Sequence, residues 1–276
     1  MLSKNLPISK KRKLRVVACI QARMGSIRLK KKALRKILGK TLIEQIFKRL
    51  KLADEIDGIV LCTSLAKEND ILVKHAKSIG LKYYRGSETD LISRIYETAK
   101  KFRANAIVRI TGDCPLVDPE IVDRMVRFWR ANYQNFDLVT NVFPPTFPDG
   151  LDVEILPTPT LKKIDSEVKD SRYREWLTCY IMENYSKFRI YNFQSPFGSS
   201  LKNMRWTVDY PEDLAFVREI FKNLGKRGEI FTTADILNLL KEKPKISDIN
   251  IDRADKIITG NIRSGAYQKL KKLKNI

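Results

Sequence analysis

The sequence predicts an α/β fold in which a mostly parallel sheet carries helices on both faces. Short apolar runs typical of buried strands alternate with amphipathic segments of helical period through about residue 110. This order favours βαβ units and hence a parallel sheet. The chain of 276 residues is long enough for one large domain of this class, and its 43% hydrophobic content supplies a core.

The first part of the chain contains four strands with helices between them. The predicted strands are Val16–Ile20, Gly58–Thr63, Leu81–Tyr84 and Ala106–Ile110. The predicted helices begin at Thr41 and run from Glu68 to Ser78 and from Glu88 to Arg103. Their apolar residues recur at three- and four-residue spacing, which places them on one helix face.

The second part is less regular. Strands are predicted at Asp137–Thr140, Leu151–Ile155, Phe188–Phe193 and Met204–Val208. Helices are predicted at Ser171–Asn184, from Pro211, and near Thr233 and Ile262. We expect a disordered basic tail at 1–14, one domain at 15–250 with an insertion or arm at 141–203, and a C-terminal helical extension at 251–276.

The formal net charge is +21 at pH 7, which favours anionic partners such as nucleic acid, an anionic membrane or small phosphorylated molecules. An ordinary lysine-rich surface gives the same balance. The chain carries no nucleic-acid-binding motif and no apolar run near the roughly 20 residues of a membrane span. Residues 1–15 lack the apolar core of a signal peptide. We therefore expect neither nucleic acid nor a membrane as partner.

The cysteines and the histidine narrow the chemistry. None of Cys19, Cys62, Cys114 and Cys179 forms a C-x-x-C pair, so buried reduced thiols in a cytoplasmic protein are expected. His75 is the only histidine, which leaves almost no material for a histidine-rich zinc site or a Ser-His-Asp triad. We expect His75 to be exposed on a helix.

A basic loop follows the first strand. It contains one glycine, one serine and five cations, which are Arg23, Arg28, Lys30, Lys31 and Lys32. Open α/β sheets bind ligands at the carboxyl ends of their strands, and a glycine lets the backbone approach a ligand closely. The loop therefore suits a bound polyphosphate, although a solvated basic loop has the same composition.

Two aspartates occupy similar positions after two other predicted strands. Asp113 follows the fourth strand behind Gly112, and Asp209 lies between a predicted strand and a helix. Two acids at the carboxyl ends of two strands can hold one divalent cation against phosphate oxygens. The alternative is that each caps a helix, and Glu212 after Asp209 gives a near-capping-box spacing.

The basic loop also resembles a known family. IQARMGSIRLKKKAL, residues 20–34, is similar to the opening motif of the sugar cytidylyltransferases, above all to the spore-coat polysaccharide branch, which reads IQARMGSTRLPGK. Lys30 and Lys31 stand where this branch has Pro-Gly. The resemblance implies a Rossmann-like three-layer nucleotide-diphospho-sugar transferase fold and a loop that cradles the triphosphate of CTP. That role falls on Arg23, Gly25, Ser26, Arg28 and Lys32.

Further segments match the family in the same order. VRITGDCPLV, ending at Val117, resembles its G-D-x-P motif, and WTVDYPEDL, ending at Leu214, resembles its D-T-P-E-D-L motif. The resemblance implies that Asp113 and Asp209 bind Mg²⁺. Glu212 and Asp213 are expected to interact with the helix dipole instead.

The resemblance also implies substrate contacts. In PDGLDVE, residues 148–154, it implies an acceptor-sugar pocket with Asp149, Asp152 and Glu154 on the sugar hydroxyls, although Asp-Gly alone is an ordinary turn signal. Asp90 and Arg94 fall in a segment near the nucleotide base, for which helix capping is the alternative.

One stretch departs from the branch. Residues 174–180 read REWLTCY where the branch usually reads R-E-H-V-T-P-Y, so Trp176 replaces a histidine and Cys179 a proline. This indicates either a different acceptor or an impaired relative. Trp can stack on a sugar or a base, or simply pack.

The function expected from these observations is activation of a sugar or sugar acid with CTP, releasing pyrophosphate, for surface polysaccharide or glycoconjugate biosynthesis. We expect a Mg²⁺-dependent cytoplasmic homodimer. The alternatives are a basic nucleic-acid-binding protein, which rests on charge alone, and a non-catalytic relative of the cytidylyltransferases.

Overall fold

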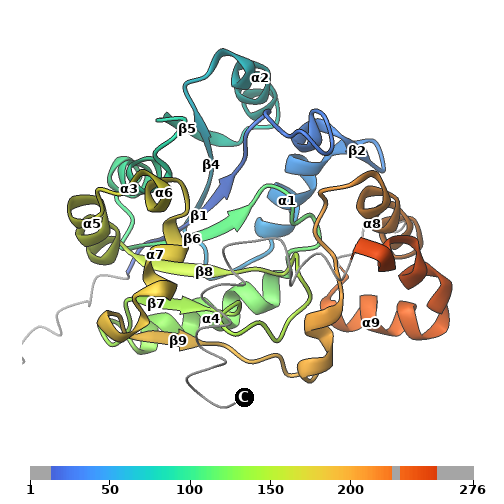
Figure 1. Ribbon diagram of the computed structural model, residues 1–276. Coiled ribbons are helices and arrows are strands. Elements are labelled where there is room, and N and C mark those ends of the chain that lie inside the picture. The colour runs from blue at the N-terminus through green and yellow to red at the C-terminus, as the bar shows by residue number, and fades with distance from the viewer. Residues whose placement is uncertain (1–13, 226–230, 254–276) are drawn as a thin grey trace, which may run out of the picture.

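The computed structural model describes residues 14–225 and 231–253. A seven-stranded sheet in the order β5-β4-β1-β6-β8-β7-β9 crosses its centre (Figure 1). The strands are β1 Val16–Gln21, β4 Gly58–Ser64, β5 Lys82–Gly86, β6 Ala106–Thr111, β7 Leu138–Thr140, β8 Glu154–Pro157 and β9 Ile190–Asn192. Strands β5, β4, β1 and β6 are parallel, and β8 is antiparallel to both of its neighbours. The predicted mostly parallel α/β sheet is confirmed.

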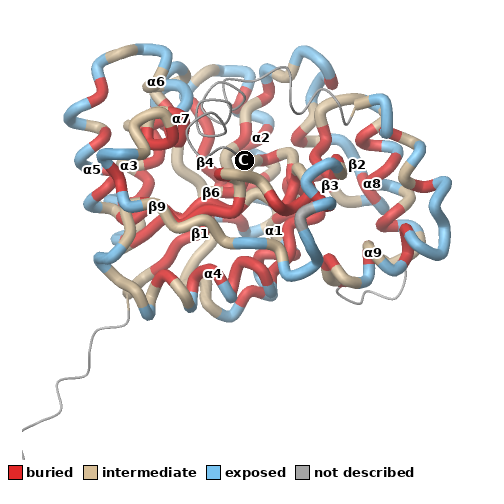
Figure 2. Tube along the Cα trace, turned by 60° about the horizontal axis from the view of Figure 1, so that its bottom comes forward, coloured by how far each residue is buried: buried red, intermediate tan, exposed pale blue. Residues whose placement is uncertain are grey.

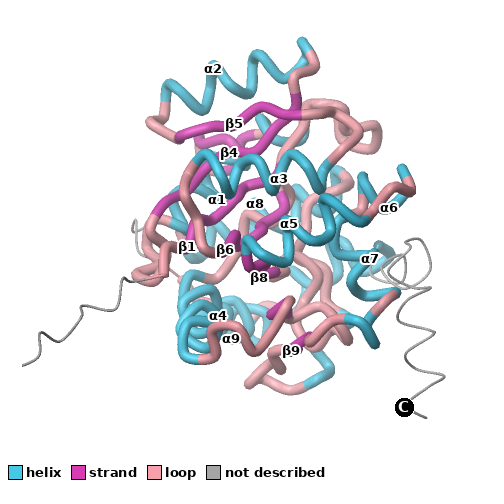
Figure 3. The backbone as a smooth tube through the Cα atoms, turned by 90° about the vertical axis from the view of Figure 1, so that its left-hand side faces the viewer, coloured by secondary structure: helices cyan, strands magenta, loops and turns pink. Residues whose placement is uncertain are grey.

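Helices cover both faces of the sheet, since strand residues alternate between the two. From β1, Ala18 and Ile20 pack against one helical layer, and Val17 and Cys19 against the other. The first layer contains α1 Leu42–Leu50, α2 Asp70–Ser78, α4 Pro119–Ala131, α8 Pro211–Leu224 and α9 Thr233–Glu242. The second contains α3 Leu91–Lys101, α5 Thr158–Glu167 and α7 Leu177–Glu183. Figure 3 looks onto α3 and α5, and Figure 2 shows the buried residues concentrated along the strands between the layers.

The region 141–203 contributes to both the sheet and the second layer. It supplies β8 and β9, and helices α5 and α7 pack their apolar residues on the same face as α3. The predicted helix over residues 171–184 is divided into α6 Ser171–Glu175 and α7. The break falls at Trp176, whose φ of −118° and ψ of 67° are not helical.

The predicted strand Met204–Val208 is wrong, because the segment forms only an isolated bridge at Arg205. Its backbone bonds are divided between two different segments. Trp206 N–H donates to the carbonyl of Asp149 at 2.6 Å, and Val208 N–H donates to the carbonyl of Asp113 at 2.8 Å. Because its N–H groups bond to two different segments, residues 204–208 cannot form a β-ladder with either one. The same bonds hold Asp149 and Asp113 close to Asp209.

The structure also tests the predictions for the cysteines and for His75. All four cysteines are buried and free, as predicted. His75 is half-buried rather than exposed, and its Nε2 lies 2.6 Å from the hydroxyl of Thr41, which also caps α1. No helix within the described residues is long and apolar enough to cross a membrane. Most of the predicted basic tail and the helix near Ile262 lie outside the described residues.

Candidate active site

Lys32 lies between the two predicted metal-binding aspartates. Its Nζ is 2.9 Å from Oδ2 of Asp113 and 2.8 Å from Oδ1 of Asp209. Burial alone would lower the pKa of Lys32, but the two carboxylates outweigh it and raise that pKa above its ordinary value. Burial likewise acts to raise the pKa of Asp113, but Lys32 holds it well below the usual range. Three predicted site residues from distant segments therefore share one charged contact.

A close approach between backbones positions Asp113. The N–H of Gly112 donates to the carbonyl of Gln21 at the end of β1, at 2.8 Å. A Cβ on Gly112 would lie 2.6 Å from the Cβ of Ala22, so only glycine fits here. The next residue, Asp113, is thereby held at the carboxyl end of β6 and beside the start of the basic loop.

The backbone of Lys31 turns the basic loop toward the acids. Lys31 has φ 55° and ψ 33°, the left-handed conformation, and directly precedes the 3-10 turn that begins at Lys32. The cytidylyltransferase branch has glycine at this position, which adopts such angles without strain. A lysine here costs about 1 kcal/mol. The loop keeps the backbone conformation that favours glycine although the glycine is absent.

Arg205 joins the segment of Asp149 to the segment of Asp209 and Asp213, and no motif in the sequence marks it. This buried guanidinium lies 3.0 Å from Oδ2 of Asp209, 3.1 Å from Oδ2 of Asp149 and 3.0 Å from Oδ1 of Asp213. Burial acts to lower its pKa, but the three carboxylates outweigh it and raise that pKa. The only sequence signal was an arginine four residues before Asp209, which is too common a spacing to single out.

Asp213 and Asn250 hold this arrangement in place. Asp213 is fully buried and accepts hydrogen bonds from the N–H groups of Asp209 and Tyr210, both at 2.9 Å, at the start of α8. This is the helix-terminal role expected for it. Asn250, in the 3-10 segment Pro244–Arg253, donates to Asp213 at 3.0 Å and to the carbonyl of Arg205 at 2.9 Å.

The other residues of the basic loop have different neighbours. Arg28 lies 2.9 Å from Asp209, with its guanidinium carbon 5.2 Å from the centre of the Tyr210 ring, and its side chain is 53% exposed. Arg23 instead pairs with Glu88 at 2.9 Å and with Glu175 at 3.3 Å. Arg28 therefore belongs to the cluster around Lys32 and Asp209. Arg23 instead contacts the segment before α3 and the end of α6.

Gly25 and Ser26 form the bend between these two arginines. A Cβ on Gly25 would meet the carboxylate of Glu68 at 3.1 Å, and the N–H of Ser26 donates to the carbonyl of Met24 at 2.8 Å. The adjoining N–H of Met24 donates to the buried side chain of Asn69 at 2.8 Å. The bend is therefore fixed against the segment that follows β4.

The two predicted nucleotide-binding residues support the start of α3. Asp90 caps this helix by accepting from the N–H of Ser93 at 2.9 Å. Arg94 is 2% exposed and donates to the carbonyls of Ser87 and Glu88. Asp90 thus has the helix-capping role that the sequence offered as the alternative, and Arg94 holds the segment that carries Glu88.

The three predicted acceptor-binding acids have different surroundings. Asp149 lies against Arg205, next to Asp209. Glu154 is 1% exposed in β8 and forms an ion pair with Arg109, its neighbour across the sheet in β6. Asp152, between them in sequence, is half-buried. Asp149 is therefore the member of this group that shares a partner, Arg205, with Asp209.

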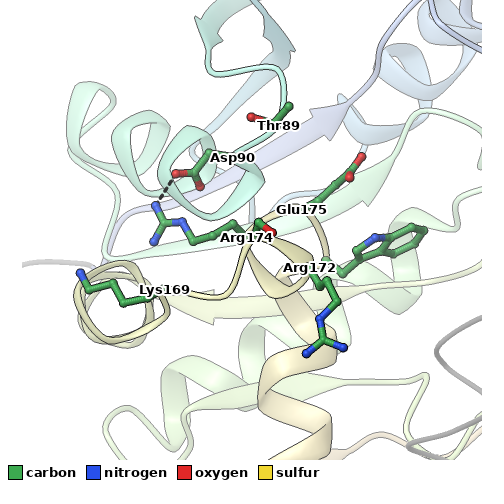
Figure 4. A pocket seen from close by; sticks show the side chains of 8 residues that line it. Thr89, Asp90, Lys169, Arg172, Arg174 and Glu175 are labelled. Atoms are coloured by element: carbon green, nitrogen blue, oxygen red, sulfur yellow. Dashed lines mark hydrogen bonds and ion pairs between the residues drawn. The ribbon is translucent and has the colours of Figure 1, made fainter.

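A pocket of about 490 Å³ opens beside Glu175 (Figure 4). Its lining residues come from the start of α3 and from the segment around α6. They are Thr89, Asp90, Lys169, Ser171, Arg172, Arg174, Glu175 and Trp176. Figure 4 shows Arg174 turned toward Asp90, with which it forms an ion pair.

Comparison with known proteins gives consistent matches. The sequence profile of a family described as Cytidylyltransferase matches residues 17–243. Uncharacterized protein MJ1063 of Methanocaldococcus jannaschii is 30% identical over 259 residues, which cover 93% of this chain and 99% of that protein. Spore coat polysaccharide biosynthesis protein SpsF of Bacillus subtilis is 27% identical over 234 residues, 83% of this chain and 95% of that protein.

One solved structure is similar in both fold and sequence. It is a cytidylyltransferase from Leptospira borgpetersenii, which superposes with a TM-score of 0.80 at 32% identity. The match covers 84% of this chain and 96% of that chain. The similarity therefore extends over most of this chain.

Proposed function

The chain belongs to the cytidylyltransferase family, and we propose that it transfers the cytidylyl group of CTP to a hydroxyl of a sugar or sugar acid. One observation carries the proposal. A lysine of the loop after β1 and two aspartates from the ends of two other segments converge within 2.9 Å at the carboxyl edge of the sheet. Open α/β sheets bind nucleotides at this edge.

In the proposed reaction the acceptor hydroxyl oxygen attacks the α-phosphorus of CTP. A new bond forms between that oxygen and phosphorus, and the bond from phosphorus to the bridging oxygen of the β-phosphate breaks. Pyrophosphate leaves, and the hydroxyl proton is released to solvent. Arg28 and Lys32 neutralise the charge that develops on the departing pyrophosphate, and the backbone around Gly25 gives the phosphates close access.

The donor set around Lys32 fits a magnesium ion. Asp113 and Asp209 direct carboxylate oxygens at a single cationic group, and one or two carboxylates with phosphate oxygens are the usual ligands of Mg²⁺. The described residues contain no group of three or more His, Cys, Asp or Glu that would form an all-protein cage. When bound, Mg²⁺ would neutralise phosphate charge and lower the pKa of a coordinated hydroxyl. Arg205 orients Asp209 for this role.

Three further points belong to the same proposal. The intact set of Lys32, Asp113 and Asp209 argues against a non-catalytic relative. The printed name of the Bacillus relative supports a role in surface polysaccharide biosynthesis. Four buried, free thiols agree with a reducing compartment, so we place the reaction in the cytoplasm.

Pyrophosphate release tests the proposal. Each of the four nucleoside triphosphates is incubated with Mg²⁺ and a panel of neutral sugars, sugar acids and sugar phosphates. We expect release with CTP and one class of acceptor, and release at least about 100-fold slower in the Asp209→Asn variant. Release that depends on no acceptor, or none with any pair, would contradict the proposal.

A further inference from the structure

The ring of Tyr210 lies among three arginines at the edge of the candidate active site. The guanidinium carbons of Arg253, Arg28 and Arg205 are 4.3 Å, 5.2 Å and 5.8 Å from its centre. All three fall within the roughly 6 Å at which a cation is attracted to an aromatic face. Every other ring with such a cation, within residues 14–225 and 231–253, has a single one. Tyr210 directly follows Asp209 and is therefore a distinctive neighbour of the proposed metal-binding site.

Of these three arginines, Arg28 is the one that is open to a ligand. The side chain of Arg205 is 6% exposed and pairs with three carboxylates, which compensate its charge. The side chain of Arg253 is 25% exposed and pairs with Glu212 at 2.9 Å. Arg28 is 53% exposed, and Asp209, at 2.9 Å, is its ion-pair partner in the described part of the chain. A phosphate group can therefore reach Arg28 without breaking a buried network.

The ion pair between Arg28 and Asp209 cannot persist unchanged in the proposed complex. Oδ1 of Asp209 contacts both Lys32 and Arg28. Once a nucleotide and its metal ion bind, Asp209 serves the ion and Arg28 serves the phosphates, so Arg28 loses the carboxylate that holds it in this structure. Fixing a free arginine side chain on a ligand costs rotamer entropy, which weakens binding. A second contact that persists through this exchange would reduce that cost.

Tyr210 provides a contact of this kind. A guanidinium presents its flat face to an aromatic ring and its N–H groups, around the edge, to phosphate oxygens, so the two contacts are compatible. Burial acts to lower the pKa of Arg28, but Asp209 and a hydrogen bond with the Tyr210 side chain outweigh it and raise that pKa. Tyr210 thus holds Arg28 through its ring and its hydroxyl, and neither contact depends on the carboxylate.

Tyr210 is itself fixed at two points. Its N–H donates to Oδ2 of Asp213 at 2.9 Å, at the start of α8. Arg253, the arginine nearest to its ring, ends the last 3-10 segment of the described chain and is bonded to the first turn of α8. The backbone of Tyr210 is therefore held by α8 and its ring by Arg253, which limits where the ring can place Arg28.

We propose that Tyr210 and Arg253 are positioning residues for Arg28. The Tyr210 ring, supported by Arg253, keeps the guanidinium of Arg28 on the phosphates while Asp209 holds the metal ion. The inference rests on the proposed function and deepens it, since it assigns a role to two residues outside the basic loop. Arg253 acts through Tyr210, and Tyr210 acts through Arg28. Neither residue touches the reacting atoms, so their loss should weaken binding of the phosphates rather than abolish turnover.

Calorimetric titration with CTP or inorganic pyrophosphate, at saturating Mg²⁺ and without acceptor, measures contact with the phosphates in the absence of turnover. We expect Tyr210→Leu to weaken both affinities about 5-fold, the scale of one cation–π contact. Tyr210→Phe keeps the ring and should recover most of the loss. Arg253→Gln should weaken both affinities about twofold, because the ring then loses its support. Lys245→Gln removes the same charge from an exposed position of the same segment and, as the matched control, should bind like wild type.

Double-mutant cycles separate positioning from a general loss of structure. Tyr210→Leu should have no further effect in the Arg28→Ala variant, because no guanidinium is left to position. Arg253→Gln should likewise have no further effect in the Tyr210→Leu variant. Urea unfolding of each variant checks that it is folded at the assay temperature. If Tyr210→Leu does not fold, Arg253→Gln, alone and together with Arg28→Ala, provides the test.

The outcomes separate the two proposals. Wild type that binds neither CTP nor pyrophosphate overturns the proposed function and this inference with it. Wild-type affinity that is unchanged in Tyr210→Leu, or in Arg253→Gln where Tyr210→Leu does not fold, overturns this inference alone. Losses that add to the loss in Arg28→Ala also overturn it. A loss in Tyr210→Phe as large as that in Tyr210→Leu overturns the role of the ring.

Discussion

Replacing Lys32 with methionine removes the cation that separates Asp113 and Asp209. Breaking a fully buried ion pair by removing one partner costs about 3–5 kcal/mol, because a buried charge is left unpaired. Here the three side chains keep 15%, 25% and 17% exposure, and Asp209 retains Arg28 and Arg205. We therefore expect Lys32→Met to lower the free energy of unfolding by about 1–3 kcal/mol at pH 7.

The loss of free energy of unfolding in Lys32→Met should be largest near neutral pH and smaller in acid. Lys32 depresses the pKa of Asp113 in the folded protein, so its contribution to stability is present above the unfolded-state pKa of about 3.9 and is lost as pH falls through the folded-state pKa. The difference between wild type and Lys32→Met should thus be largest near neutral pH and should shrink below about pH 4. Lys32, whose own pKa is raised, keeps its contribution until pH rises beyond its unfolded value of 10.5.

Magnesium should restore part of the lost stability, since it returns positive charge between the two carboxylates. For a dissociation constant of about 1 mM, about 10 mM Mg²⁺ would stabilise the variant by about 1.4 kcal/mol. Wild type, with Lys32 in place, should gain less. Urea unfolding with and without Mg²⁺ from pH 2 to 9 measures both effects, with Lys162→Met as the surface control. A penalty that is the same at every pH, or an equal magnesium effect in both proteins, would refute the reasoning.

Further predictions follow from the same site. Arg28→Ala should weaken triphosphate binding by about 1.5–3 kcal/mol with little change in thermal stability, and equal affinity by calorimetry would count against it. Asp113→Asn and Asp209→Asn should each lower turnover about 100-fold or more, and the double variant should lose little more; independent, additive losses would remove the shared ion. Lys31→Gly should relieve the left-handed strain and raise the melting temperature by a few degrees, and a fall would show that the strain is not stored there. Sedimentation should give a homodimer at micromolar concentration, and a monomer would argue against that expectation.

The parallel half of the sheet and the loop that holds the site were predictable, because their signals are local. Apolar runs, helical spacing and the position of Gly25 and Lys32 after a strand depend on neighbours in sequence. The antiparallel insertion of β8 between β6 and β7 was not predictable in the same way. Its register depends on contacts such as Glu154 with Arg109, 45 residues apart, which no local pattern encodes.

The residues of the candidate site that lie in motifs were predictable, whereas the residues that hold them in place were not. Asp113 and Asp209 could be chosen because each follows an apolar run. Arg205 and Asn250 could not, because their importance comes from burial beside Asp213, and burial of a single polar residue leaves no periodic trace in the sequence. The strand at 204–208 was predicted wrongly for a similar reason, because its backbone partners are distant in sequence and lie in two separate segments.

The hydrogen bonds of Asn250 have a consequence for where this domain ends. The family profile stops at residue 243, so a truncation at that boundary would remove Asn250 and Arg253. Asn250 closes the bonding of Asp213, and Arg253 lies with its guanidinium carbon 4.3 Å from the centre of the Tyr210 ring, beside Asp209. The boundary of the catalytic unit is therefore set by its network of contacts and reaches at least to residue 253, ten positions beyond the end of the family profile.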